Sequence, residues 1–503
     1  MQGYLKLVER KGSALFWSLT MRAFSRHFQP ALGLRYHVKD YRYEDCTHYI
    51  STADLAGLTS LLKETIGTQS DYWEWYLNRC RELGDQLVHT AQRLGASIPA
   101  GTDVQRFQEG FESFTEATKN VMPFLLSTSI AERLVEEQLR HAIQQESTVA
   151  AGIVDGATVL AELRASAAPN APLEEMRHCY QLAWTINDDQ RLRETVLRLS
   201  ADAFIEELRV LRPELEREIA SHVEQYGWLR TYAYRFEPMR QADLIERIRT
   251  VIRLNRIPRW ERPRQGVDLR SILSREPSDE LRRWASLIEQ LVAVRFYRST
   301  VHWRADTLAR PFFHALAASQ NMSRNDLVFC TEDELLAGLQ GGRFPDLCEL
   351  RLREQNWYNM RLLDDVIALE TNAAPSMTAS RGLPLTLKGS TASMGRVVGR
   401  ARIVLSAEDR RDVREGDIVV TTMTTPDFMD VLEKCAGIVT DEGGILCHAA
   451  VISRELNVPC IIGTGEASHM LRNNMTIEMD ATQAEGIVNC VHDAEETDGG
   501  GVL

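Results

Sequence analysis

The chain has 503 residues, more than one hydrophobic core usually serves, so we expect several domains. Its hydrophobic content of 44% and charged content of 26% are typical of globular proteins. A formal net charge of −13 argues against a nucleic-acid-binding protein, which would present a basic face. Residues 14–24 are too short and too polar to cross a bilayer, so no membrane partner is expected. The nine cysteines form no Cys-x-x-Cys pair, which favours a cytoplasmic location and argues against a metal site.

Residues 1–369 are predicted to form a large all-α body that binds a substrate or a partner. Apolar side chains recur there at three- and four-residue spacing, as in Leu281, Trp284 and Ile288, which is the pattern of an amphipathic helix. Stretches rich in Ser, Asp, Pro and Gly separate these segments and do not suggest strands. No repeat recurs at a fixed period, so a helical solenoid is not expected.

One basic face of this body is a candidate substrate site. Arg295, Arg298 and His302 are spaced by three and four residues, which places them on one face of a helix. The simpler interpretation is a solvated or salt-bridged helix surface. The alternative is that this face binds an anionic substrate.

The composition changes after residue 369. Residues 370–384 are rich in small residues, Thr, Ser and Pro without helical periodicity, and they are predicted to form a flexible linker. Strands are then predicted at 396–404, 417–422, 437–440, 460–463 and 476–479, and helices at 427–435 and 447–456. Residues 385–492 are therefore predicted to form a compact α/β domain. The acidic, glycine-rich residues 493–503 are predicted to be a disordered tail.

His448 is the candidate catalytic residue, because it opens a predicted helix that follows a short apolar strand. The free N–H groups and the positive dipole end of a helix N-terminus favour an anion. A histidine placed there suits a nucleophile that carries a phosphoryl group. Gly443 and Gly444 allow backbone amides to approach a phosphate, and Thr440 and Cys447 offer further hydrogen bonds.

Arg454 is the remaining candidate phosphate-binding residue. It lies six residues beyond His448, so it is not directly beneath it on an ideal helix, and a structural ion pair is the alternative role. Residues 385–492 contain ten Lys or Arg and fifteen Asp or Glu. We therefore expect phosphate to be recognised by backbone amides and by cations that docking partners supply.

The stretch Gly443-Gly444-Ile-Leu-Cys-His448-Ala-Ala-Val-Ile-Ser-Arg454-Glu resembles the phosphohistidine signature of the phosphoenolpyruvate (PEP)-utilising enzymes. That family includes phosphoenolpyruvate synthase, pyruvate phosphate dikinase and rifampicin phosphotransferase. Residues 395–401, 422–427, 436–444 and 486–488 are also similar to the family, in the same order, so the resemblance covers about residues 385–491. It implies a β/β/α swivelling domain in which His448 is phosphorylated. One departure is Leu446, where synthase-like members usually have threonine.

A weaker resemblance lies upstream, where residues 295–335 are similar to the helical segment before the swivelling domain of rifampicin phosphotransferase-like proteins. In this family an ATP-grasp domain phosphorylates the histidine. The chain shows no glycine-rich phosphate loop and no strand-rich N-terminal half. A PEP-binding barrel after residue 503 is not expected. The resemblance therefore implies a stand-alone form that needs a separate ATP-grasp subunit, where ATP and Mg²⁺ would bind.

Three hypotheses follow. In the first, the chain is a dikinase-like phosphotransferase component in which His448 passes the phosphoryl group to a small molecule bound by the helical body. In the second, it is a split phosphoenolpyruvate synthase-like subunit that acts on pyruvate. In the third, it is a non-catalytic phosphocarrier or regulatory scaffold.

Overall fold

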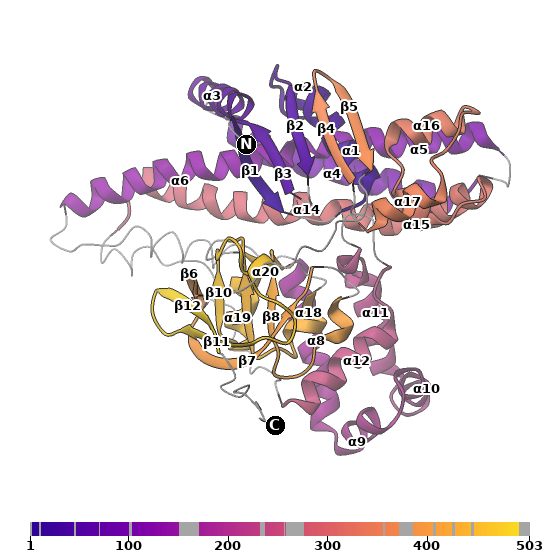
Figure 1. Cartoon of the computed structure of the whole chain (residues 1–503), viewed down its shortest axis with the longest axis vertical. Coiled ribbons are helices and arrows are strands. Elements are labelled where there is room, and N and C mark those ends of the chain that lie inside the picture. Colours follow the sequence, from indigo (N-terminus) through magenta and orange to yellow (C-terminus); the bar gives the residue numbers. More distant parts are fainter. Residues whose placement is uncertain are drawn as a thin grey trace, which may run out of the picture. The chain divides into compact units, whose positions relative to one another are not determined.

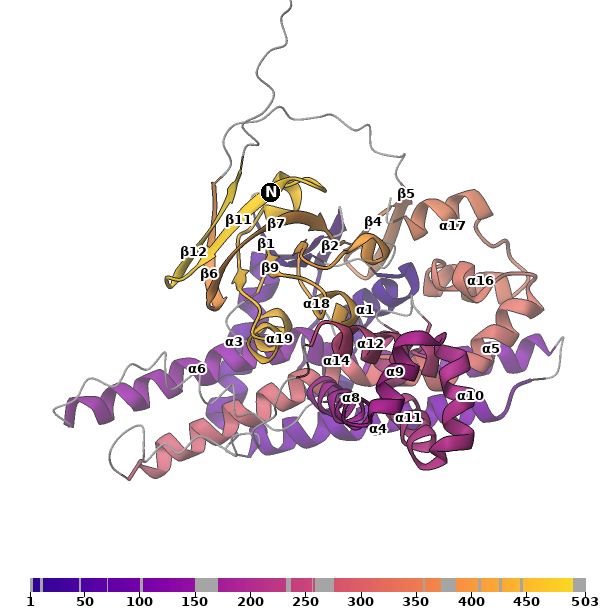
Figure 2. The same ribbon diagram turned by 90° about the horizontal axis from the view of Figure 1, so that it is seen from below.

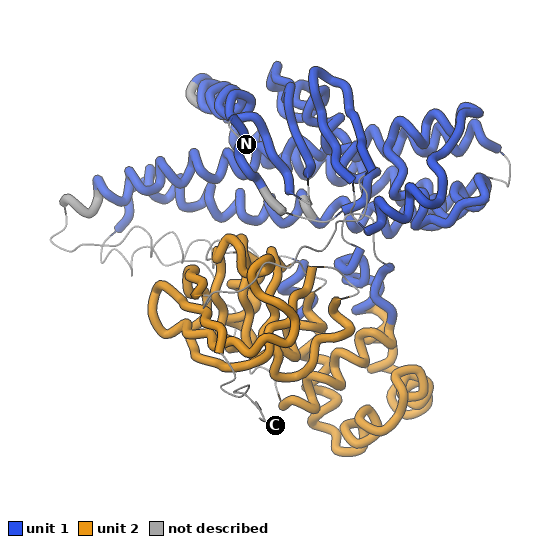
Figure 3. The backbone as a smooth tube through the Cα atoms, viewed as in Figure 1, with its two compact units in different colours: residues 1–176, 222–240, 262–375 blue, residues 177–221, 241–261, 376–503 orange. Residues whose placement is uncertain are grey.

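The computed structural model of the chain describes residues 3–9, 12–44, 47–69, 71–99, 103–149, 171–231, 237–255, 257, 276–355, 358–371, 386–405, 409–424, 428–443 and 447–491. Figure 1 shows how its helices and strands are arranged, and Figure 2 shows them from below. The chain divides into two compact units, which Figure 3 draws in different colours. The first comprises residues 1–176, 222–240 and 262–375, and the second comprises residues 177–221, 241–261 and 376–503. Within the described residues, none of the helices combines the length and the apolar composition that a membrane crossing requires.

The first unit is built around one 41-residue helix, α14. The helices of this unit are α1 (Ala14–Arg26), α2 (Phe28–Leu32), α3 (Thr52–Thr68), α4 (Tyr72–Ala96), α5 (Val104–Val121), α6 (Pro123–Val149), η1 (Gly227–Arg230), α14 (Asp279–Ser319), α15 (Arg324–Val328), α16 (Glu332–Leu339) and α17 (Leu347–Glu354). Helix α14 begins after Ser278, whose side chain accepts a hydrogen bond from the Leu281 N–H and so satisfies a donor of the first turn. It then packs along α4 and α6 (Figures 1 and 2).

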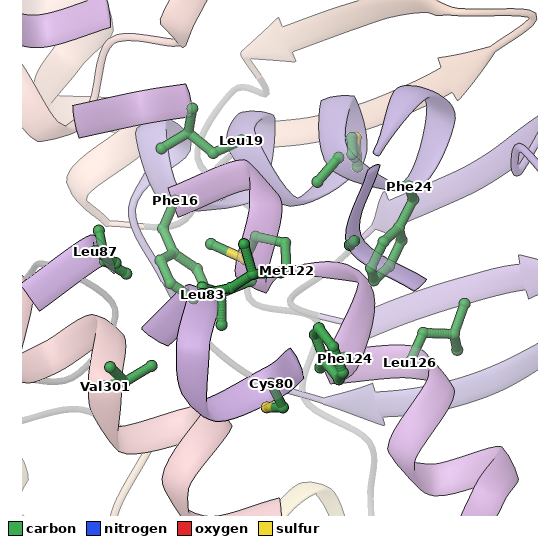
Figure 4. Close-up of a cluster of buried hydrophobic side chains, with 14 of the residues drawn as sticks. Phe16, Leu19, Phe24, Cys80, Leu83, Leu87, Met122, Phe124, Leu126 and Val301 are labelled. Carbon is green, nitrogen blue, oxygen red and sulfur yellow. The ribbon is translucent and has the colours of Figure 1, made fainter. Parts of the chain in front are cut away.

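The hydrophobic core of the first unit lies where α1, α4, α6 and α14 meet. Figure 4 labels Phe16, Leu19 and Phe24 of α1, Cys80, Leu83 and Leu87 of α4, Met122 just after α5, Phe124 and Leu126 of α6, and Val301 of α14. All of these side chains are buried. Full burial of a large apolar side chain contributes about 1.5–3 kcal/mol, so the cluster explains why these four helices assemble.

The first unit also contains an antiparallel sheet, so the prediction of an all-α body was wrong. Its strands are β1 (Tyr4–Glu9), β2 (Asp40–Glu44), β3 (Thr47–Ser51), β4 (Tyr358–Leu363) and β5 (Val366–Thr371), in the order β1-β3-β2-β4-β5. The sheet joins distant parts of the chain, because Tyr43 of β2 pairs with Met360 of β4. These strands have five or six residues each. The alternation of polar and apolar residues in β2 and β4 was a strand signal that the helical interpretation of residues 1–369 overlooked.

The second unit contains a set of helices that we call the helical lobe, residues 177–221 and 241–261. Its helices are α8 (Ala171–Asp188), α9 (Gln190–Arg198), α10 (Ala201–Leu211), α11 (Pro213–Tyr226) and α12 (Gln241–Arg253). Helices α8 and α11 each contribute residues to both units. Helix α12 packs against α9 and α10 through its apolar face, which includes buried Leu244, Ile248 and Val251.

The rest of the second unit is a closed barrel, which we call the C-terminal barrel. Its strands are β6 (Thr386–Ser393), β7 (Gly395–Ile403), β8 (Ile418–Thr421), β9 (Gly437–Thr440), β10 (Cys460–Ile462), β11 (Thr476–Ala481) and β12 (Glu485–Cys490), in the order β10-β6-β12-β11-β7-β8-β9. Its short helices are η3 (Asp409–Asp412), α18 (Met429–Leu432), α19 (His448–Leu456) and α20 (Ala467–Met470). The predicted α/β character of this domain is confirmed, whereas β6 and β12 were not predicted.

The division into units differs from the predicted domains in one respect. The helical lobe belongs with the C-terminal barrel, although its sequence lies inside the predicted body of residues 1–369. Of the predicted linker 370–384, the first two residues end strand β5 and the remainder lies outside the described residues. The predicted tail 493–503 also lies outside them.

Candidate functional site

The candidate site lies where three neighbouring parallel strands of the C-terminal barrel end. Strands β8 and β9 pair in parallel with Thr421 opposite Thr440, and β9 pairs in parallel with β10. The carboxyl ends of parallel strands meet at one edge, which is where α/β folds place ligands. The chain segments that follow Thr421, Thr440 and Ile462 therefore converge.

His448 is the first residue of α19, the helix that connects β9 to β10. Cys447 is the N-cap, with extended backbone angles, so the helix begins at His448 as the sequence predicts within one residue. Helix α19 ends at Asn457 in the left-handed conformation, which leads the chain back into β10. The imidazole is thus carried at a helix N-terminus, where backbone N–H groups favour an anion.

The His448 ring is oriented by Thr424, which follows β8. The Thr424 Oγ1 lies 2.9 Å from the His448 Nδ1, and Thr424 is 4% exposed. When Nδ1 carries the proton and donates it to this hydroxyl oxygen, Nε2 keeps its lone pair. Histidines that work as ligands or bases are commonly oriented in this way by a partner on the second nitrogen. In that tautomer the unprotonated Nε2 is chemically able to act as a nucleophile.

The turn between β9 and His448 is held by side chains at the same edge of the barrel. The Asp441 carboxylate accepts hydrogen bonds from the Ser468 backbone N–H (3.1 Å) and from the Thr464 Oγ1 (3.0 Å). Thr464 follows β10, so this bond ties the ends of β9 and β10 together. Asp441 is 4% exposed, and its carboxylate acts here as a structural acceptor.

Four of the five predicted phosphate-site residues are described. Thr440 is buried and donates from Oγ1 to the Glu442 carbonyl (2.7 Å), which shapes the turn. Gly443 has φ = +121°, and a Cβ there would lie 2.8 Å from the Cys447 Sγ, so the turn requires glycine. Arg454 donates from Nε to the Ala392 carbonyl of β6 (3.1 Å) and thereby anchors α19. Gly444 lies outside the described residues.

Sequence reasoning did not single out Thr424. Its only signal was its place in the stretch 422–427, which matches the family pattern. Its role depends on the parallel pairing of β8 with β9, because that pairing brings residue 424 to residue 448. Nothing in the sequence near Thr424 indicates that its side chain will contact His448.

The three candidate substrate residues of the first unit lie along α14, but they do not form a solvated face. Arg295 forms an ion pair with Glu132 of α6 (2.9 Å). Arg298 is 7% exposed and His302 is fully buried. Burial, and then the charge of Arg298, lower the pKa of His302 to about 3, so its imidazole is neutral near pH 7.

The buried His302 ring packs against an aromatic side chain, although its two ring nitrogens need hydrogen-bond partners. Its ring meets the Phe16 ring edge-on, with centroids 5.9 Å apart. Within the part of the chain that the structure describes, neither ring nitrogen of His302 has a hydrogen-bond partner. One turn further along α14, Asp306 accepts a hydrogen bond from the Arg310 Nη2 (2.8 Å), so polar side chains continue along this buried face. Unpaired buried polar groups are rare and call for an explanation.

No cluster of three or more His, Cys, Asp or Glu side chains that could hold a metal ion occurs among the described residues. The expectation that ATP and Mg²⁺ bind to a separate subunit stays a prediction.

Comparison with known proteins bears on the C-terminal barrel. Residues 413–484 match the family described as "PEP-utilising enzyme, mobile domain". A probable phosphoenolpyruvate synthase of Methanothermobacter thermautotrophicus is 34% identical over 158 residues, which are 29% of this chain and 23% of that protein. The phosphoenolpyruvate synthase of Pyrococcus furiosus is 47% identical over 105 residues, 20% of this chain and 13% of that protein. The chain thus spans less than a quarter of the length of these relatives.

Proposed function

We propose that the chain, whose residues 413–484 match the mobile domain of PEP-utilising enzymes, is a phosphotransferase component in which His448 carries the phosphoryl group. The observation that carries the proposal is the bond between Thr424 Oγ1 and His448 Nδ1 at the N-terminus of α19. It leaves Nε2 to react, next to backbone amides suited to phosphate oxygens.

The reaction has two steps. The Nε2 lone pair attacks the terminal phosphorus of the donor, the N–P bond forms, and the P–O bond to the leaving phosphate or nucleotide breaks with its electron pair. The Nδ1 proton stays hydrogen-bonded to Thr424. An acceptor hydroxyl then attacks the phosphorus, the N–P bond breaks, and its electron pair returns to Nε2. The hydroxyl proton leaves to a base or to water.

The donor in this proposal is ATP with Mg²⁺ on a separate ATP-grasp subunit. What supports it is the chain's own charge, since residues 385–492 hold ten Lys or Arg against fifteen Asp or Glu. An acidic domain needs cations from elsewhere to bind a nucleotide triphosphate. The partner is thus expected to supply both the nucleotide site and the compensating positive charge.

The acceptor in this proposal is a small molecule that binds the first unit near Arg298 and His302 of α14. What supports it is the unsatisfied imidazole of His302 beside a buried guanidinium. A polar ligand that donates a hydrogen bond to the neutral imidazole would satisfy one of its nitrogens.

A second candidate function is that of a subunit of a split phosphoenolpyruvate synthase. The sequence identity to phosphoenolpyruvate synthases favours it, with the mobile domain as the shared part. It predicts pyruvate-dependent isotope exchange into PEP. A phosphocarrier without a small-molecule acceptor would show neither this exchange nor any phosphorylated product.

The experiment is phosphorylation of the full-length chain by ATP and Mg²⁺ in the presence of a co-purified ATP-grasp subunit. We expect one acid-labile phosphoryl group by intact-mass analysis and none in His448→Ala. His469→Ala is the matched control, since His469 is an exposed histidine of the same barrel and should leave the labelling intact. Full turnover by the His448→Ala protein would refute the proposal.

A further inference from the structure

A buried carboxylate joins the C-terminal barrel to the helical lobe within the second unit. Glu433 directly follows α18, and it is 1% exposed. Its Oε1 accepts a hydrogen bond from the Arg247 Nε of α12 (2.8 Å) and from the Tyr180 hydroxyl of α8 (3.1 Å). Both partners belong to the lobe, and both are buried. Glu433 therefore holds the barrel against the lobe through these two hydrogen bonds.

The two donors on the lobe suit the Glu433 carboxylate, because one is a neutral phenol and the other is a cation. Burial, and then the negative charge of Glu433, raise the pKa of Tyr180 well above its usual value, so the phenol keeps its proton and donates it. Arg247 supplies the compensating positive charge. A buried ion pair of this kind adds little net stability compared with apolar side chains, but it fixes one register, and losing one partner is costly.

An electrostatic interaction also reaches α19. Burial raises the pKa of Glu455, while the charges of Arg177 and then Arg454 act in the opposite direction. Arg177 belongs to α8, so the lobe places a positive charge whose field acts on the helix that carries His448. The hydrogen-bonded contact itself is the one that Glu433 makes with Arg247 and Tyr180.

The chain connections indicate whether the helical lobe or the C-terminal barrel is the part that can move away from the other. The lobe is tied into the first unit by α8 and α11, which each pass through the unit boundary as one helix. The C-terminal barrel is connected to preceding residues by the single stretch between β5 and β6. Release of the barrel from the lobe breaks no helix, whereas release of the lobe with the barrel would break two.

We propose that α8 and α12 form a docking surface for the C-terminal barrel, with Glu433 as the anchor that must leave its buried site each time the barrel moves. This rests on the proposed role of the barrel as a carrier, and it names the place where the carrier is held. The segment from Thr424 to Glu433 connects the two features, since it begins at the residue that orients His448 and ends at the anchor.

Hydrogen exchange of the full-length chain tests the docking surface without any phosphorylation. In Glu433→Ala, amides of α12 and of residues 429–433 should exchange at least about tenfold faster, because the buried ion pair between Arg247 and Glu433 is lost. Strands β7 and β11 should keep their protection. Glu485→Ala is the matched control, since its ion pair with Lys388 is exposed on the same barrel, and it should leave α12 unchanged.

A double variant that strengthens the contact between lobe and barrel provides a second test. Arg247→Met with Glu433→Leu replaces the ion pair with apolar side chains, which commonly keeps a buried contact or strengthens it. We expect slower exchange in α12 and at least about tenfold slower phosphoryl transfer. Direct labelling of His448 by phosphoramidate, which needs no partner, should be unchanged. Failure of that labelling in the unsubstituted chain would count against the proposed function and not against the docking surface.

Two results would overturn the docking surface. In the first, Glu433→Ala removes protection from β7 and β11 together with α12, which would make lobe and barrel a single folding unit. In the second, exchange in α12 does not respond to Glu433→Ala, or the apolar double variant turns over at the unsubstituted rate.

Discussion

The Thr424 hydroxyl oxygen lies 2.9 Å from the Nδ1 of His448, and the two residues come from the ends of adjacent parallel strands. The orientation of the His448 imidazole is therefore set by strand pairing as much as by the helix that carries the histidine.

Removing this hydroxyl should slow phosphorylation of His448. Thr424→Val keeps the shape of the side chain but loses the bond to Nδ1, worth about 0.5–1.5 kcal/mol, so we expect up to about a tenfold slower reaction. The rate is measured by intact mass with phosphoramidate as donor over a range of pH. Thr424→Ser, which retains the hydroxyl, should recover most of the rate. Equal rates in the valine variant and the unsubstituted chain would show that Thr424 does not orient the ring.

Gly443 should be intolerant of a side chain. Its φ is +121°, and a Cβ would lie 2.8 Å from the Cys447 Sγ, so Gly443→Ala should lower the free energy of unfolding by about 1–3 kcal/mol and reduce labelling of His448. Gly416 is the control, since it also has a positive φ but a Cβ there meets nothing within 4 Å. Urea unfolding should therefore show a smaller loss for Gly416→Ala. Equal losses in the two variants would assign the effect to φ alone.

His302 should make the first unit less stable in acid. Its pKa of about 3 in the fold lies below the ordinary value of 6.5, so protons bind preferentially to the unfolded chain between these values. Its contribution to stability is present above about pH 6.5 and is lost as the pH falls toward 3. His302→Leu should reduce this loss, which urea unfolding at several pH values measures.

His302→Leu also tests whether the acceptor binds at α14, separately from its effect on stability. If the acceptor binds at α14, His302→Leu lowers phosphoryl transfer to the acceptor while His448 is still labelled by phosphoramidate. Unchanged transfer would place the acceptor elsewhere.

Glu334 of α16 should contribute stability that acid removes. Burial acts to raise its pKa, but hydrogen bonds from Arg353 and from the Thr331 N–H outweigh this and lower it below 4.5. The contribution is therefore present above pH 4.5 and is lost as the pH falls through the lowered value. At neutral pH, Glu334→Gln should cost about 1–3 kcal/mol.

Urea unfolding of Glu334→Gln at neutral and at acid pH measures both effects. Glu82→Gln is the control, because the ion pair between Glu82 and Arg79 is largely exposed and should cost at most about 1 kcal/mol. A similar loss in both variants, or the same acid sensitivity after Glu334→Gln, would contradict the prediction.

The site was predictable where its signals are local. Strand β9 was predicted at residues 437–440 and is observed there, because its four consecutive residues are all buried between turn signals. Helix α19 was predicted from residue 447 and begins at His448. The phosphohistidine pattern covers these two elements together.

Features that depend on distant pairing were missed. The first unit's sheet needs Tyr43 to meet Met360. Both stretches alternate polar and apolar residues, but their pairing across the chain has no local signal. The grouping of α12 with the barrel depends on Arg247 reaching Glu433, 186 residues away in the chain. Periodicity within a short window contains no information on such contacts.

The closure of the barrel has a further consequence if the barrel is released and recaptured as proposed. Strand β10 pairs with β6 as well as with β9, so every strand of the barrel has a neighbour on both sides. A sheet without free edges offers no row of unpaired N–H and C=O groups to a strand of another molecule. A barrel released in this way would offer no strand edge as a template for aggregation.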